Sequence, residues 1–84
     1  MQFEDIGEAI EVIAVFQENR MRPVRFRWNG RVFKIKRING SWKSDQGAAR
    51  FHHFSVMAEG PDVYEISYNP ERYAWNIDRV CMEG

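Results

Sequence analysis

The sequence has one cysteine, and it has no apolar run long enough to cross a bilayer. Because Cys81 is the only cysteine among 84 residues, a disulfide within the chain is excluded, and a single free thiol fits a reducing cytoplasm. A membrane-spanning helix needs about 20 consecutive apolar residues, and the sequence has no such run. The opening residues MQFEDIGEAIE are acidic, unlike the positive end of a signal peptide. We therefore expect a cytoplasmic protein without membrane association.

The sequence also has few residues in patterns that build catalytic or metal sites. Its two histidines, His52 and His53, are adjacent, and adjacent residues of a strand point to opposite faces, so they do not readily share a metal ion. Cys81 has no sequence context that would activate it as a nucleophile, and no serine lies in a nucleophile-elbow motif. An enzyme would need a pocket that gathers His52 or His53 with carboxylates. We predict no catalytic residue, no metal, no cofactor and no enzymatic activity.

Length and composition predict one folded domain over residues 1–84. Two domains in a chain of this length would each be too small to bury a core. Hydrophobic residues make up 44% of the sequence and aromatic residues 14%. That is enough apolar surface for a core, which argues against intrinsic disorder.

Residues 19–44 contain no Asp or Glu, although the net charge of the chain is zero. All twelve acidic residues lie in the flanking segments. Such a separation indicates a surface of one sign, and it says more about partners than the net charge does. The basic residues of the segment are Arg20, Arg22, Arg25, Arg27, Arg31, Lys34, Lys36, Arg37 and Lys43.

The segment RPVRFRWNGRVFKIKR, residues 22–37, predicts a β-hairpin. Asn29-Gly30 between two alternating runs favours a type I′ turn, because both central residues of that turn need positive φ. A two-residue turn sets the register, so that Phe26 faces Phe33 and Arg25 faces Lys34. Side chains alternate along a strand. One face then carries Val24, Phe26, Trp28, Phe33 and Ile35, and the other carries Arg25, Arg27, Lys34 and Lys36.

Other alternating runs predict strands at residues 50–58, 63–68 and 73–80, and residues 39–49 read as a loop with Trp42 anchored on the core. The N-terminal segment 1–16 fits two structures. Phe3, Ile6, Ile10 and Ile13 would line one side of a helix, whereas Ile10, Val12, Ala14 and Phe16 would share one face of a strand. The β-branched run IEVIAV favours a strand from about residue 9 to 17, after a loose or singly turned segment 1–8.

These elements predict an all-β fold of five or six short antiparallel strands in meander order. A sheet of this size twists and curls, which reduces its exposed edges. We expect a curled sheet or a small half-open barrel, and the sequence leaves open whether it closes.

Two blocks of the sequence resemble a family of short, functionally uncharacterised bacterial β-domain proteins. The first is RPVRFRWNGRVFKI, with the pattern Pro-x-x-Phe-x-Trp-x-Gly-Arg-x-aromatic, and the second is VYEISYNPERYAWNIDRV. The resemblance covers roughly residues 10 to 80. It implies a single domain and, because relatives are sometimes encoded beside translesion-polymerase-like proteins, a link to DNA transactions. It implies no catalytic residues.

The basic side of the hairpin is the candidate site. Arg25, Arg27, Lys34 and Lys36 form its centre, with Arg22, Arg31, Arg37 and Lys43 around the rim, and cations at strand spacing can contact successive phosphates. The alternative is a solvated face, partly neutralised by Glu11 or Glu65, that suppresses edge-to-edge aggregation.

Few aromatic side chains are expected beside these cations. A sheet that binds RNA by stacking displays aromatics among its basic residues, but the hairpin's aromatics are predicted on the opposite face, and only Trp42 is expected to be free. The expected partner is therefore a nucleic-acid backbone or an acidic protein surface.

A second function class uses the aromatic face instead of the cations. Tyr64, Tyr68, Tyr73 and Trp75 are expected mainly in the core, but Tyr and Trp also anchor protein interfaces. If the sheet stays open, a homodimer would cover its apolar face. The charges would then serve only solubility.

Overall fold

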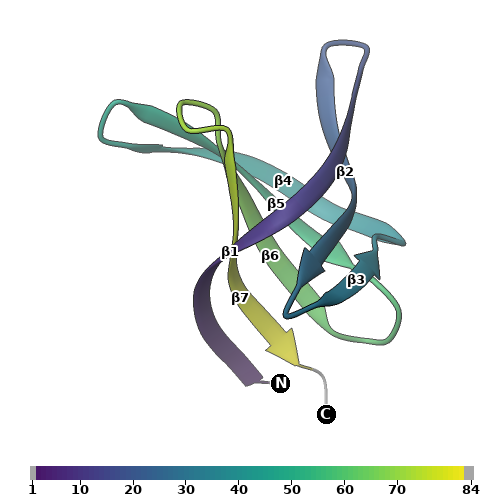
Figure 1. The fold of residues 1–84 in the computed structure, drawn as a ribbon. Coiled ribbons are helices and arrows are strands. Elements are labelled where there is room, and N and C mark those ends of the chain that lie inside the picture. Colours follow the sequence, from purple (N-terminus) through teal and green to yellow (C-terminus); the bar gives the residue numbers. More distant parts are fainter. Residues whose placement is uncertain (1, 83–84) are drawn as a thin grey trace.

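The computed structural model describes residues 2–82, which form one seven-stranded antiparallel sheet (Figure 1). The predicted domain limits at residues 1 and 84 lie outside the described residues. The strands are β1 (Gln2–Gln17), β2 (Arg20–Trp28), β3 (Arg31–Lys34), β4 (Arg37–Gln46), β5 (Ala49–Met57), β6 (Val63–Asn69) and β7 (Ala74–Met82).

The strands follow one another as a meander whose first and last members also pair. The spatial order is β3-β2-β1-β7-β6-β5-β4, so β3 and β4 are the two edges. The connection between β3 and β4 makes hydrogen bonds to two other strands. Ile35 N–H donates to the carbonyl of Val24 on β2 over 3.0 Å, and Lys36 N–H donates to the carbonyl of Met57 on β5 over 2.8 Å. The sheet therefore curls until its edges approach at this connection, without closing into a barrel. The all-β meander prediction is confirmed.

The predicted count of five or six strands is wrong because residues 39–49, expected to be a loop, contain most of β4. This strand pairs with β5 along most of its length, with an irregularity between Ile38 and Gly40. It is an edge strand whose side chains are nearly all exposed. An edge strand that buries little needs no apolar alternation, so its polar, glycine-containing sequence reads as a loop.

The prediction of a loose segment at residues 1–8 is also wrong for residues 2–8, and residue 1 lies outside the described residues. β1 begins at Gln2, which pairs with Met82, and the pairing with β7 continues through an irregularity between Asp5 and Glu8. Gly7 lies in this irregularity with φ of 67°. The one extra residue of β1 interrupts the period of two, which hid the strand in the sequence. The predicted strand from about residue 9 to 17 is confirmed as the second half of β1.

The predicted hairpin of residues 22–37 is confirmed in its turn and its register. Asn29 has φ of 52° and Gly30 has φ of 73°, as a type I′ turn requires. The pairs are Trp28 with Arg31, Arg27 with Val32, Phe26 with Phe33, and Arg25 with Lys34.

The core lies on the inner side of the curl. Phe26, Val56, Ile66 and Ile77 are almost completely buried there. The Phe26 ring stacks on Phe33 with centroids 4.8 Å apart and meets Tyr64 edge-on at 5.5 Å. Burial of side chains of this size stabilises the fold by roughly 1.5–3 kcal/mol each.

Two hairpins extend beyond this core as arms. Figure 1 shows the β1–β2 hairpin and the β4–β5 hairpin diverging at the end of the molecule away from the two termini. Their turns lie at residues 18–19 and 47–48. The arms leave the inner side of the sheet uncovered between them.

Candidate nucleic-acid interface

A bulge in β2 assembles the cations on the outward side of the β2–β3 hairpin. Ile13 pairs with Arg25 but Ala14 pairs with Pro23, so β2 has one extra residue relative to β1. The extra residue reverses the alternation of side chains. Arg22 therefore shares a side of the sheet with Arg25, which an unbroken strand would not allow. The exposed cations gathered here, called the basic face below, are Arg22, Arg25, Arg27 and Lys34.

The other four predicted site residues are not among the outward-facing residues of β2 and β3. Arg31 pairs with Trp28, and its guanidinium lies 5.0 Å from the centre of the Phe33 ring. Lys36 follows the end of β3, in the connection between the two sheet edges. The remaining two, Arg37 and Lys43, lie on β4 at the opposite edge.

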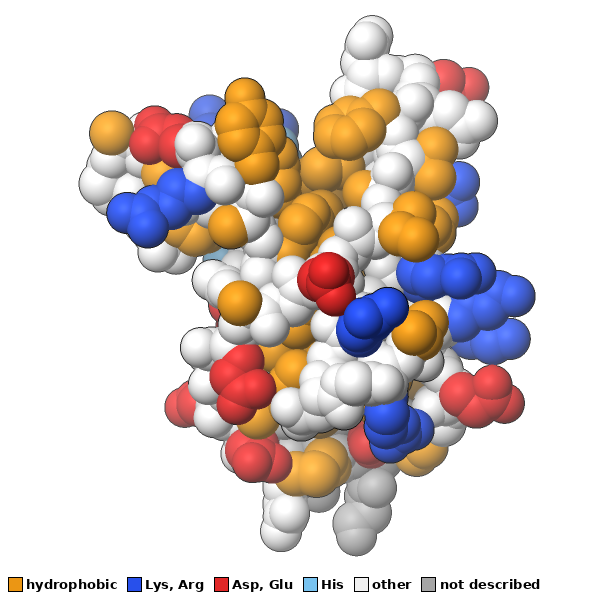
Figure 2. Space-filling model, in the orientation of Figure 1, with side chains coloured by type: hydrophobic (Ala, Val, Ile, Leu, Met, Phe, Trp, Pro, Cys, Tyr) orange, Lys and Arg blue, Asp and Glu red, His pale blue; other side chains and the backbone are white. Residues whose placement is uncertain are grey.

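Little negative charge opposes the basic face. Arg27 Nη1 lies 3.6 Å from Glu11 Oε1, and both side chains are well exposed, so this pair adds little stability. Glu65, a predicted neutralising partner, instead pairs with Arg79 at 3.1 Å. Among residues 2–82, no ion pair holds Arg22, Arg25 or Lys34. Figure 2 shows Lys and Arg side chains gathered over β2 and β3, at the right of the view.

A second surface lies between the arms. It is a groove of about 1210 Å³, called the arm groove below, and its sides come from three hairpins. In Figure 2 it is the hollow between the two upper projections, with hydrophobic side chains along it. The lining includes Phe16 and Met21 from the β1–β2 arm, His52 and Lys43 from the β4–β5 arm, and Tyr68 and Tyr73 from the β6–β7 hairpin.

Aromatic side chains at the arm groove are more exposed than the sequence indicated. Phe16 is 74% exposed and Tyr73 is 83% exposed. The expectation that only Trp42 is free to stack is therefore wrong. Trp42 is not anchored on the core either, because it is exposed and its ring lies parallel to that of His53, 5.2 Å away. The alternation of β1 places Phe16 on the inner side, but no sequence signal shows that the core ends before it.

The charged residues that line the arm groove are all basic: Arg20, Lys43 and Arg50. Arg50 also pairs loosely with the exposed carboxylate of Asp45, at 3.9 Å. The pKa of His52, on the same strand as Arg50, lies below its usual value. Burial is the largest cause, and the neighbouring cations of Lys43 and Arg50, with His53, add to it.

On the outer side of the sheet, Ser44, His53 and Asp78 form a chain of polar contacts. Ser44 Oγ lies 2.6 Å from Nε2 of His53, and Nδ1 of His53 lies 3.7 Å from Asp78 Oδ2. Ser67 Oγ donates to the other oxygen of Asp78 over 3.1 Å. Burial raises the pKa of Asp78, and the hydrogen bond from Ser67 partly opposes this. The four residues come from β4, β5, β6 and β7, so the network ties these strands together.

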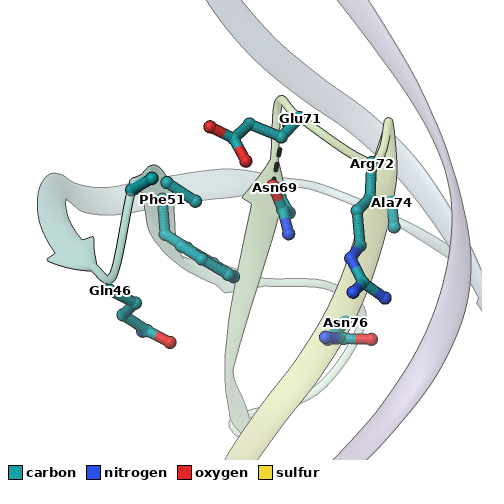
Figure 3. A pocket seen from close by; sticks show the side chains of 9 residues that line it. Gln46, Phe51, Asn69, Glu71, Arg72, Ala74 and Asn76 are labelled. Carbon is teal, nitrogen blue, oxygen red and sulfur yellow. Dashed lines mark hydrogen bonds between the residues drawn. The ribbon is translucent and has the colours of Figure 1, made fainter.

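The order of Ser44, His53 and Asp78 is that of a hydrolase triad, and the sequence had not brought them together. A triad acts on a substrate held beside the serine. A pocket of about 540 Å³ between the β4–β5 and β6–β7 turns is lined by Phe51 and Asn76, the strand partners of Ser44 and Ser67, but by none of the three triad residues. In Figure 3 its polar side chains come from both turns, and Asn69 Oδ1 accepts a hydrogen bond from the backbone of Glu71 over 3.0 Å. This pocket therefore places no substrate beside Ser44.

The described residues hold neither a metal site nor a membrane-spanning helix. Within residues 2–82, no group of three or more His, Cys, Asp or Glu side chains could bind a metal ion. His52 and His53 point to opposite faces, as predicted: His52 contacts Tyr68, and His53 contacts Ser44. In the same range no helix is long and apolar enough to cross a membrane.

Comparison with known proteins places the chain in a family. No curated protein and no solved structure matches it. Residues 1–80 match a family described as "Domain of unknown function (DUF6504)". This match covers nearly the whole chain and confirms the resemblance to an uncharacterised domain family. The chain belongs to the DUF6504 family.

Proposed function

We propose that this protein is a non-catalytic binding domain whose basic face contacts the phosphate backbone of a nucleic acid. The observation that carries the proposal is the grouping of four exposed cations on one side of the β2–β3 hairpin, opposed by a single exposed ion pair to Glu11. The tight turn at Asn29 and Gly30 and the buried Phe26 hold this hairpin in place.

The geometry suits a repeating anion. Alternate residues of a strand lie about 6.7 Å apart, and neighbouring strands about 4.8 Å apart, so the cations form a small array and not a line. Each phosphate neutralised on duplex DNA makes the affinity fall with salt by a logarithmic slope of about 0.9. Four contacts would give a slope of about 3.6 and a weak, sequence-independent Kd of about 10⁻⁴ to 10⁻⁶ M.

The test measures binding of labelled DNA and RNA at several salt concentrations. The triple variant R25S/R27S/K34S should lose most of the binding, and Arg25→Ser alone should reduce the salt slope by about one. Arg72→Ser is the matched control, since it removes one exposed cation from the β6–β7 turn and should leave the slope unchanged. Absence of salt-dependent binding by the natural protein refutes the proposal. Binding to polyglutamate but to no nucleic acid would assign the face to an acidic protein.

A homodimer through the aromatic face is the second candidate. Tyr64 is buried within the core, and Trp75 packs on Phe54 and Tyr68, so most of the predicted face is occupied within the chain. The exposed ring of Tyr73 is the observation that favours an interface. Sedimentation over a concentration series distinguishes the two: a stable dimer that Tyr73→Asn dissociates would support the second candidate.

Location and genomic context stay predictions. Cys81 is a buried free thiol, which is compatible with the cytoplasmic location proposed from the sequence. The neighbouring genes would test the proposed link to DNA transactions.

A further inference from the structure

We propose that the arm groove binds unpaired nucleotides of a single-stranded nucleic acid, with Phe16 and Tyr73 stacking on bases and Arg20 and Lys43 contacting phosphates. The inference rests on the proposed function, because it names the kind of nucleic acid that the basic face would retain. It adds a second surface, on the other side of the sheet, that recognises bases.

The charge of the arm groove selects an anionic occupant. Its charged lining residues are Arg20, Lys43 and Arg50, with no Asp or Glu among them. Two acids lie nearby: Asp45, which pairs with Arg50 at 3.9 Å, and Glu18, in the turn of the β1–β2 arm. Among residues 2–82, Arg20 and Lys43 have no ion pair. The groove thus offers at least two cations to a ligand.

The exposed ring of Tyr73 is held at a cost to the fold. Tyr73 is 83% exposed, and its backbone has φ of 53°, in the left-handed region that disfavours residues other than Gly, Asn and Asp. Asn or Gly would suit both the exposure and the backbone better. Phe16, on the facing arm, is also unsupported by the core. Exposed rings on both sides of a basic groove are the arrangement that proteins use to stack single-stranded bases.

Stacking also distinguishes single strands from duplexes. Every base has a flat face, but in a duplex that face is covered by the adjacent base pair, so the rings of Phe16 and Tyr73 could not reach it. Tyr68 is held in place by Trp75, with ring centroids 5.0 Å apart, and also lines the groove. The groove should therefore prefer single strands, whereas the basic face alone should bind both forms.

The experiment compares binding of a thymidine oligonucleotide of about 12 nucleotides with its duplex by fluorescence anisotropy. Phe16→Ala and Tyr73→Asn should each lower the affinity for the single strand by about 5- to 100-fold and leave the duplex unchanged. Phe3→Ala is the matched control, because Phe3 is an exposed ring at the opposite end of β1. Tyr73→Asn should also keep or raise the melting temperature, so that a loss of binding is not a loss of fold.

The outcomes separate the two proposals. If single strand and duplex bind equally, and the Phe16 and Tyr73 variants bind as the natural protein does, the groove inference is wrong. Under that result, weaker binding by R25S/R27S/K34S would leave the proposed function standing. If no nucleic acid binds at all, the proposed function fails and the inference fails with it. If Tyr73→Asn dissociates a dimer without changing oligonucleotide binding, the groove is a protein interface and the inference is overturned.

Discussion

Replacing Phe26 by alanine should destabilise the fold far more than the same change at Phe16. Phe26 is 1% exposed, and its ring contacts Phe33 and Tyr64, so truncation removes apolar contacts and leaves a cavity between β2 and the core. Such changes lower the free energy of unfolding by about 3–5 kcal/mol. Phe16 is 74% exposed on the β1–β2 arm, and its truncation should cost less than about 1 kcal/mol.

Urea and thermal denaturation followed by circular dichroism measure both effects. For a domain of this size, about 3 kcal/mol lowers the melting temperature by at least 12 °C, whereas Phe16→Ala should shift it by only a few degrees. Because Phe26→Ala could unfold a marginally stable domain, Phe26→Leu provides a milder step, with an expected loss below about 1.5 kcal/mol. Equal losses for the two alanine variants would refute the placement of the core on the inner side of the curl.

Three further changes probe the turn, the polar network and the groove histidine. Gly30→Ala should lower the free energy of unfolding by about 1 kcal/mol, because the backbone φ of Gly30 is 73°, even though no atom obstructs the added carbon. Gly40→Ala is the comparison, since Gly40 has an ordinary φ, and this change should be neutral or stabilising. Urea titration measures both variants. Ser44→Ala should cost about 1 kcal/mol in the same assay, since it removes the partner of His53 Nε2, and an unchanged midpoint would contradict this contact. The pKa of His52 in the folded protein is lowered, chiefly by burial, so the unfolded chain binds its proton more readily. The free energy of unfolding should then fall as pH drops through 6.5. When unfolding is measured from about pH 7.5 to 5.5, His52→Gln should make this pH dependence flatter. A steeper dependence in the variant would contradict a lowered pKa of His52 in the folded protein.

The parts of the fold that follow from local rules were predicted from the sequence. Asn29 and Gly30 determine a turn, the turn determines the pairing of Phe26 with Phe33, and alternation then assigns the faces. The meander order follows similarly from short connections. Where the alternation is interrupted, the prediction failed. The irregularity around Gly7 hid the first half of β1, and the polar edge strand β4 resembled a loop.

The candidate site was predicted only in part, for the same physical reason. Arg25, Arg27 and Lys34 lie together because they belong to one hairpin with known register. The position of Arg22 depends on a bulge whose partner is on β1, so it depends on a pairing that the sequence does not display. The arm groove depends on where the curl of the sheet places three hairpins that are distant in sequence. No local pattern indicates that Phe16 faces it.

Binding and stability are separable in this fold because the arms are extended by strand pairing and not by core burial. β1 continues past its last core contacts with unbroken alternation, so Phe16 keeps facing the inner side where no strand covers it. A residue in that position contributes little to the free energy of unfolding, and a polar one would serve solubility better. The same holds for Tyr73, whose backbone conformation would favour another residue. Two exposed rings that the core does not need, on two hairpins that line one basic groove, are most simply explained by a ligand that stacks on them. Variants at these positions should therefore lose the ligand while keeping the fold.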